Sequence, residues 1–385
     1  MYKFNFHIPT NVLFGSGEVA VAGKVIASLG NRALVVTGTH SAYDMGLLNK
    51  IETQLKQSGC AVSIFLGVRP NPTIEQVESG VKQAIDTNTN VIVAVGGGSV
   101  CDFARAVSLG VTHSGDIWEY RVTGNKGVAG IRDVLLPLVT IPTIAGTGSE
   151  VSPAFLISKG TSKQVFFSPY LFPKAAIIDP SLALHAPIGL SLEIGFDAFV
   201  QGFEAFVSRT ATPLSDTFAL RGMQLAAENL KLLLDKGDNI AARTNMALAA
   251  LLSLFGVNQA GVGGVHALSD QLSGHYNVWH GLALAAVIGA VVNFNIDANY
   301  TKYAQIAEVL GASIDRLTIS EAAQQAVVKV QKFTEELGLF HTLRDFGMNE
   351  SNIIPFAQEA QNPDLASNPK TMSEQDIVKI YEYLL

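Results

Sequence analysis

The pattern of apolar residues changes once along the chain, and this change constrains the fold more than any other feature. In the first half, continuous apolar runs such as 32–37 and 90–95 end at glycines, and helical patterns follow them. Such runs are typical of strands buried on both faces of a parallel sheet, and strands alternating with helices predict a doubly wound α/β domain. After Pro187 the periodicity is helical to the end of the sequence.

The change near Pro187 predicts two domains. A length of 385 residues also exceeds the usual size of a single domain. We therefore assign residues 1–187 to an α/β domain and residues 188–385 to an all-helical domain. Edge strands are expected within residues 1–14. Further strands are expected at 60–66, 135–141, 154–158 and 175–178.

Composition excludes several classes of function. The chain is 48% apolar and 15% charged, which suits a well-formed core and excludes disorder. A net charge of -7 without a Lys/Arg cluster argues against a nucleic-acid partner. Cys60 and Cys101 lack zinc or redox spacing, which fits a cytoplasmic location. The uncharged stretch 246–268 is long enough to span a bilayer, but polar residues and glycines interrupt it, so we expect core helices and no membrane contact.

A glycine cluster after a buried strand predicts a phosphate-binding turn. Gly96, Gly97, Gly98 and Ser99 separate this strand from a helix. Glycine lets the backbone approach phosphate oxygens, and a helix N-terminus presents free N–H groups. We expect Ser99 to cap the helix and to donate to the phosphate. A Cβ at Gly97 or Gly98 is expected to occupy the space of a pyrophosphate, although ordinary tight turns use the same residues.

A second polar loop, residues 140–152, follows another apolar strand. It carries Thr143, Thr147 and Ser149 among glycines, a composition that also suits a turn with hydroxyl caps. Two such loops at the carboxyl ends of strands in one sheet favour a dinucleotide site over two unrelated turns.

Residues 261–281 gather side chains that can bind a metal. His266, His275 and His280 lie there together with Asp270. Asp270 follows His266 by four residues, so the two share one face of a helix. Histidine is the commonest metal ligand among side chains, although each of these histidines taken singly also suits a core or surface position.

The chain is expected to turn at Gly274 and to bring His280 back beside His266. Asp197 is the best candidate for a third ligand. Three protein ligands with one open position are typical of a catalytic divalent site.

Several of these segments, in the same order, resemble the iron-containing (group III) alcohol dehydrogenases, essentially end to end. The resemblance implies a Rossmann-like domain followed by an all-helical metal-binding domain, the dehydroquinate synthase-like fold. It also implies NAD(P)-dependent interconversion of a small alcohol and an aldehyde or ketone, and a homodimer. The matching segments are FGSGE (14–18), GGGSVCDFARA (96–106), IPTIAGTGSEVS (141–152), AAIIDP (175–180), GFDAFVQGFEAFVS (195–208), HALSDQLSGHYNVWHG (266–281) and NPDLASNPKTMSEQDI (362–377).

The resemblance carries roles onto particular residues. Asp270 or His275 is expected to relay the proton between substrate and solvent. Arg105 stands where the family usually has Lys, and Ile144 where it usually has Thr. The implied metal ligands are Asp197, Gln201, His266 and His280. The implied cofactor-binding residues are Gly38, Thr39, Ser41, Gly96, Gly97, Gly98, Ser99, Asp102, Thr140, Thr143, Thr147, Ser149 and Lys163.

Two residues depart from the family pattern in one pocket. Gln201 stands where one of four ligands is usually His, and Asp270 stands where a His usually lines the substrate pocket. Because an amide oxygen is a weaker donor than imidazole, three hypotheses stay open. Fe²⁺ or Zn²⁺ is held by Asp197, His266 and His280 alone, or Asp270 supplies the lost ligand, or no metal binds.

Because the sequence leaves open whether a metal binds, it also allows other classes of protein. A protonated histidine in place of the metal would suit a reductase of an activated carbonyl. A lyase of the dehydroquinate synthase type and a non-catalytic nucleotide-binding relative are the further alternatives.

Cofactor choice is expected to depend on the residue that ends the strand 32–37. Members that require NAD carry an acidic residue there, whereas this chain has Gly38. Thr39 and Ser41 can bond a 2′-phosphate. The sequence therefore predicts NADP, with NAD as the alternative.

Overall fold

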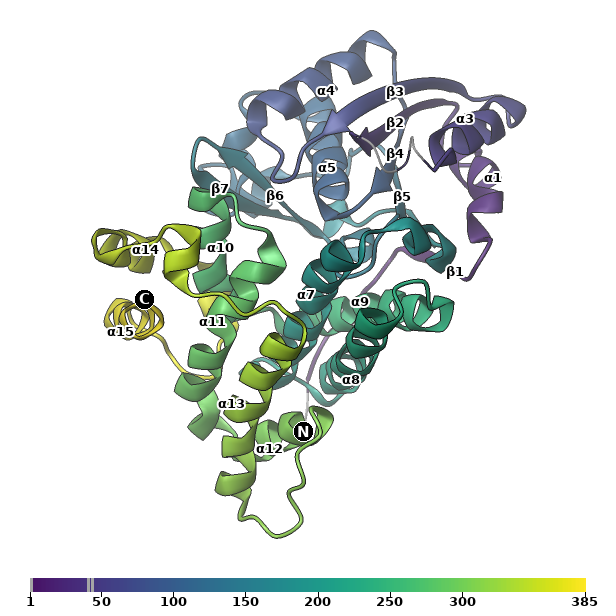
Figure 1. Cartoon of the computed structure of the whole chain (residues 1–385). Coiled ribbons are helices and arrows are strands. Elements are labelled where there is room, and N and C mark those ends of the chain that lie inside the picture. The colour runs from purple at the N-terminus through teal and green to yellow at the C-terminus, as the bar shows by residue number, and fades with distance from the viewer. Residues whose placement is uncertain (1–2, 40–41, 43–44) are drawn as a thin grey trace. The chain divides into compact units, whose positions relative to one another are not determined.

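The chain forms two compact units in the computed structural model, which describes residues 3–39, 42 and 45–385 (Figure 1). One unit is His7–Ala186, and the other is Pro187–Leu385 together with the first residues up to Phe6. The start of the chain, which the sequence pattern places in the α/β domain, thus groups with the helical unit. There the ring of Phe6 stacks on Phe218, with centroids 5.6 Å apart.

The first unit contains a six-stranded sheet in which every pairing is parallel, in the order β1-β8-β5-β4-β2-β3. This arrangement confirms the doubly wound sheet predicted from the apolar runs. The strands are β1 (Asn11–Phe14), β2 (Arg32–Gly38), β3 (Ala61–Val68), β4 (Val91–Gly96), β5 (Leu138–Pro142) and β8 (Ala175–Ile178).

Helices cover both faces of this sheet. Alternate residues of its central strands point to opposite faces, and both sets are apolar, so each face is buried beneath helices. Along β2, Leu34 and Val36 join the core beneath α4 and α5, whereas Ala33 and Val35 join the core beneath α1 and α3 (Figure 1). The helices of this unit are α1 (Ala22–Ala27), α3 (Leu47–Gln57), α4 (Ile74–Asp86), α5 (Gly98–Thr112) and the short α6 (Gly127–Gly130).

Two expectations about strands are confirmed only in part. The edge strand expected within residues 1–14 is β1, but pairing begins at Asn11, and residues 3–10 form no strand. The strand expected at 154–158 is present but does not join the parallel sheet. It is β6 (Ala154–Lys159), which forms an antiparallel hairpin with β7 (Ser162–Phe167), a strand that the sequence analysis missed. Gly160, with φ of +61°, makes the two-residue turn that reverses the chain.

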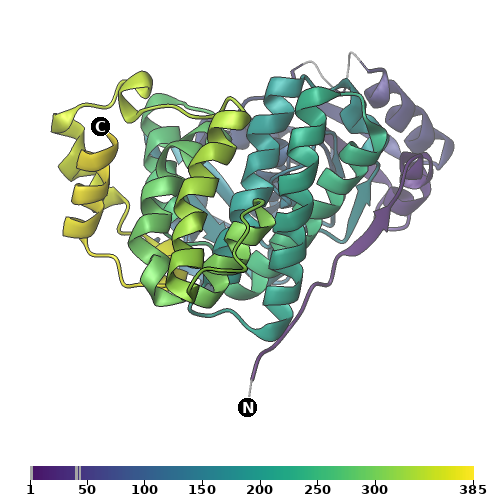
Figure 2. The same cartoon turned by 60° about the horizontal axis from the view of Figure 1, so that its bottom comes forward.

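Helices make up the second unit, as predicted. Its helices α7, α8 and α9 pack together, and α12 packs on α13; Figure 2 views the same helices from below. Phe196, Phe199 and Phe333 form an aromatic cluster in its core. The helices are α7 (Ile188–Val207), α8 (Pro213–Asp235), α9 (Ile240–Ala260), α10 (Gly264–Tyr276), α11 (His280–Asn295), α12 (Tyr300–Val309), α13 (Ile319–Glu336), α14 (Ile353–Glu359) and α15 (Glu374–Leu384).

Two stretches of this unit, Ile240–Ala260 and His280–Ala298, are long and apolar enough to cross a membrane by length and composition alone. Of the most apolar window in each, 56% and 67% are buried within the fold. Burial of this extent is also found in core helices, so the two stretches are weak support for membrane insertion.

Candidate functional site

The glycine turn predicted to bind phosphate connects β4 to α5. Gly97 is the N-cap of α5, and no side chain caps the helix. Ser99 is therefore already inside the first turn, and the expectation that it caps the helix is wrong. Gly97 has an extended backbone, with φ of -85° and ψ of -168°, and as N-cap it starts the helix two residues earlier than a cap at Ser99 would. An uncapped helix N-terminus after a parallel strand suits a bound phosphate.

The second polar loop lies directly against this turn. A Cβ built on Gly98 would come within 3.0 Å of the Thr147 side chain, and one built on Gly97 within 3.3 Å of Ile144. The structure thus brings the two predicted loops together. It also gives a further reason for the glycines, because a side chain at either position would press against the second loop.

Some predicted cofactor residues have their polar atoms engaged within the protein. The Ser149 hydroxyl lies 3.0 Å from Arg105 Nη1 and 3.2 Å from Asp102 Oδ1, and the Thr140 hydroxyl donates to the Glu150 carbonyl at 3.1 Å. Burial raises the pKa of Asp102 to about 6, although Arg105 acts in the opposite direction. Asp102, Thr140 and Ser149 therefore hold the loops in place.

Arg105 is the centre of this polar network. It is fully buried and donates to the carbonyls of Ser149 and Leu171 as well as to the Ser149 hydroxyl. The arginine that departs from the family pattern thereby ties α5 to the second loop. A planar guanidinium holds several such bonds in a fixed fork, a geometry that the ammonium of the Lys in the family pattern does not offer.

The other predicted cofactor residues lie at the ends of strands or on the hairpin. Gly38 ends β2, and among the described residues a Cβ there would come within 4 Å of the Val68 carbonyl oxygen alone, at 3.8 Å. Thr39 is exposed, Thr143 is buried just after β5, and Lys163 is on β7. Ser41 lies outside the described residues.

Replacing Gly98 by Val is expected to weaken NADH binding by at least about tenfold, because charge-assisted bonds from the helix N-terminus contribute about 1.5–3 kcal/mol each. The valine side chain would displace Thr147 and open the turn. Fluorescence titration with NADH checks this, and thermal unfolding checks that the unit remains folded. Unchanged affinity in a folded variant would contradict the assignment of this turn to the cofactor.

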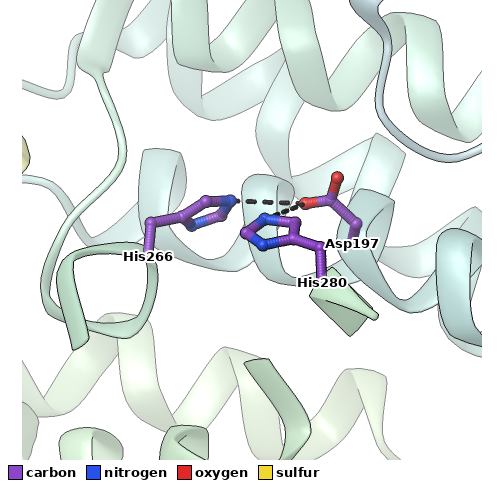
Figure 3. A group of neighbouring side chains, drawn as sticks. All are labelled: Asp197, His266 and His280. Carbon is purple, nitrogen blue, oxygen red and sulfur yellow. Dashed lines mark hydrogen bonds and ion pairs between the residues drawn. The ribbon is translucent and has the colours of Figure 1, made fainter. Parts of the chain in front are cut away.

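The metal-binding side chains gather in the helical unit. Asp197 comes from α7, His266 from α10 and His280 from α11, and one ligand atom of each lies within 4.8 Å of the others. His266 Nε2 is 3.3 Å and His280 Nε2 is 3.9 Å from the same atom, Asp197 Oδ1 (Figure 3). The structure therefore brings together three of the four predicted ligands.

Tight backbone geometry at the two ends of α10 helps to place the histidines. A Cβ on Gly263, the N-cap of α10, would lie 3.1 Å from Asn368 Oδ1, an atom that also accepts from the N–H of Gly264. The turn before His280 is made by Asn277, with φ of +52°, and not by Gly274, which is inside α10. Asn tolerates this left-handed conformation better than most residues.

Gly281 allows α11 to begin directly against α7. A Cβ there would lie only 1.8 Å from the Glu193 carbonyl oxygen. The glycine that follows His280 is thus a requirement of the close contact between these helices.

A carboxylate lies behind each of the two imidazoles. Glu204 Oε2 is 2.5 Å from His266 Nδ1, and Asp270 Oδ1 is 3.8 Å from His280 Nδ1. Burial alone would lower the pKa of His266, but the charges of Glu204 and Asp197 outweigh it and raise that pKa well above its ordinary value. The same negative potential favours a divalent cation.

Gln201 and His275 lie in different surroundings. Gln201 is buried one turn after Asp197 on α7, hence on the same face. His275 follows His266 by nine residues, which places it on the opposite face of α10. Its Nε2 lies 2.8 Å from Glu359 Oε2 on α14. The structure does not bring His275 to the metal-binding group.

Glu204 and Asp364 are site residues that the sequence analysis missed. Glu204 follows Asp197 by seven residues, so helical periodicity could have placed it on the same face. Asp364 comes from the short turn Pro363–Ser367, far away in sequence. Burial and the nearby charge of Asp270 raise the pKa of Asp364 to about 7. Only the tertiary fold reveals this neighbour.

The donor set fits a divalent transition metal. One carboxylate oxygen and two imidazole nitrogens suit Zn²⁺ or Fe²⁺, and three protein ligands leave room for a substrate oxygen. Each imidazole presents Nε2 to Asp197 and Nδ1 to a second carboxylate, an arrangement that is usual for metal-binding histidines. The residues present therefore match the metal that the family resemblance implies.

Comparisons with known proteins identify the class. The family described as iron-containing alcohol dehydrogenase matches residues 9–180, and the C-terminal family of Fe-containing alcohol dehydrogenases matches residues 192–385. The chain therefore belongs to the iron-containing alcohol dehydrogenase family. It is an oxidoreductase that acts on CH–OH groups with a nicotinamide cofactor, and the lyase alternative finds no support.

Individual relatives extend over the whole chain. The 1,3-propanediol dehydrogenase of Citrobacter freundii is 34% identical over 98% of both chains. The NAD-dependent methanol dehydrogenase of Bacillus methanolicus is 32% identical over 99% of this chain and all of the relative. A crystal structure of 1,3-propanediol oxidoreductase superposes with a TM-score of 0.93 at 32% identity and covers 100% of both chains.

Proposed function

We propose that this alcohol dehydrogenase interconverts a small alcohol and its aldehyde at a divalent metal, Fe²⁺ or Zn²⁺, held by Asp197, His266 and His280. The observation that carries the proposal is the convergence of these three ligand atoms within 4.8 Å. The substrate class is supported by the relatives named for 1,3-propanediol, methanol and choline, which are 32–34% identical to this chain.

The residues of this chain have distinct tasks in such a reaction. When bound, a divalent ion supplies Lewis acidity that polarises a carbonyl oxygen or lowers the pKa of an alcohol. Asp197 supplies a negative ligand, and His266 and His280 supply neutral ones. Asp197 and His266 are buried, which limits the access of bulk water to these two ligands. Gln201 shares the Asp197 face and is our candidate for a weak fourth ligand.

We further propose that NADP(H) is accepted in preference to NAD(H), by a homodimer in the cytoplasm. The cofactor preference is supported by the absence of an acidic side chain at Gly38 and by the space beside it. The cytoplasmic location is supported by two cysteines without metal or redox spacing. The dimer is supported by the family resemblance.

Metal analysis and a substrate panel test the proposed reaction. Protein purified without added metal is analysed for bound elements and then assayed with short alcohols and aldehydes, with and without Fe²⁺ or Zn²⁺. Activity that depends on metal supports the proposal. Equal activity after complete chelation would favour the metal-independent reduction of an activated carbonyl, the hypothesis motivated by Gln201.

Replacing Gly38 by Asp is expected to shift the ratio of kcat/KM for NADPH over NADH downward by about tenfold. The added carboxylate would repel a 2′-phosphate and accept from a ribose 2′-hydroxyl. Gly38→Asn is the matched control, because it adds the same shape without the charge and should shift the ratio much less. An unchanged ratio in Gly38→Asp would place the ribose elsewhere.

A further inference from the structure

We propose that Asp270 is a positioning residue for His280, acting on the ring nitrogen that faces away from the metal-binding group. This role differs from both roles expected from the sequence, which were proton relay and fourth ligand. The inference rests on the proposed metal site and concerns how this chain retains a metal although Gln201 stands where the family usually has a histidine ligand.

The first observation is the orientation of the His280 ring. Its Nε2 lies 3.9 Å from Asp197 Oδ1, whereas its Nδ1 lies 3.8 Å from Asp270 Oδ1. The two nitrogens of an imidazole point in divergent directions. A carboxylate beside Nδ1 therefore lies behind the ring, and it cannot share an ion bound at Nε2.

The second observation is that a closer version of this arrangement occurs at His266, where the carboxylate is hydrogen-bonded to Nδ1, whereas Asp270 is an ion-pair neighbour of His280 at 3.8 Å. Glu204 Oε2 lies 2.5 Å from His266 Nδ1, and the other carboxylate oxygen of Glu204 accepts from the Val265 N–H at 2.6 Å. Glu204 is thus fixed in place and holds the ring with Nε2 toward Asp197. Two ligands from two helices are each backed by a carboxylate.

The third consideration is chemical. The negative charge of Asp270, 3.8 Å from Nδ1, favours the tautomer of a neutral imidazole that carries its proton on that nitrogen. This tautomer leaves the Nε2 lone pair for the metal, and the nearby charge increases its basicity. It also adds negative charge near the ion. Both effects strengthen binding by His280, which compensates for the weaker donor Gln201.

Cobalt binding tests this role without a measurement of catalysis. Co²⁺ affinity is measured by chelator competition, and the visible absorption of the Co²⁺ form reports its ligands. Asp270→Asn is expected to weaken binding by about 10–100-fold, as for other residues behind a ligand. Its absorption bands should match those of the wild type, whereas His280→Ala should change them.

Glu359→Gln is the matched control. It breaks another carboxylate–histidine pair, between Glu359 and His275 at 2.8 Å, in which the histidine is not a ligand. Its Co²⁺ affinity should equal that of the wild type, and Glu204→Gln should behave like Asp270→Asn. Thermal unfolding without metal verifies that each variant is folded.

The outcomes separate this inference from the proposed function. Unchanged affinity in Asp270→Asn overturns the positioning role and leaves the metal site intact. Altered absorption bands in that variant also overturn it, because Asp270 would then be a ligand. Wild-type protein that binds no Co²⁺ overturns the metal site and this inference together.

Discussion

Replacing Asp197 by Ala is expected to remove metal binding, with a loss of affinity above about 100-fold, and with it the dehydrogenase activity. Residues behind a ligand already contribute 10–100-fold, and Asp197 is the residue toward which both imidazoles point. It is also the only carboxylate in the ligand group. Elemental analysis and Zn²⁺ competition measure the loss.

Thermal unfolding with and without metal supplies an independent measurement. A ligand present at a thousand times its Kd stabilises a protein by about 4 kcal/mol. Wild type should therefore unfold at a higher temperature with Zn²⁺ than with chelator, whereas Asp197→Ala should unfold at one temperature in both. Metal retained at full occupancy by Asp197→Ala would contradict the ligand assignment.

Gln201→His is the complementary variant, because it restores an imidazole one turn after Asp197 on the same face of α7. We expect it to raise metal affinity by about tenfold or more. Full occupancy in the wild type without a gain in this variant would mean that the coordination is already complete.

Features encoded by neighbouring residues could be predicted from the sequence. The run 91–95 is buried along its whole length, and the glycines after it form the turn into α5. Even here the predicted N-cap residue was wrong. Ser99 and Gly97 lie two positions apart, and both residue types can begin a helix. The hairpin of β6 and β7 was missed because SKQVFF carries its apolar residues at one end only.

The metal ligands were predictable for a different reason. Histidines and an aspartate within apolar helices are conspicuous, and helical spacing places Asp270 beside His266. Whether its carboxylate meets the ion or the far side of His280 depends on how α10 lies against α11. Tertiary packing determines that contact, as it determines the approach of Asp364 to Asp270. Neither can be predicted from the spacing of residues in the sequence.

Gly281→Ala is expected to destabilise the helical unit by about 3 kcal/mol, the upper end of the usual range for overpacking. The new Cβ would lie 1.8 Å from the Glu193 carbonyl oxygen, a backbone atom that a side-chain rotation cannot move aside. Helix α11 must therefore shift away from α7. A fall in Tm of roughly 6–12 °C should follow for a unit of this size.

The shift should also weaken metal binding, because His280 precedes Gly281 and begins α11. Gly289→Ala is the matched control. Gly289 lies in the same helix, and no atom of the described residues lies within 4 Å of a Cβ built there. An alanine in mid-helix should stabilise the unit by about 0.5–1 kcal/mol and leave Zn²⁺ affinity unchanged. If Gly281→Ala unfolded and bound Zn²⁺ like Gly289→Ala, α11 would have to lie farther from α7, and the position of His280 beside Asp197 would lose its structural basis.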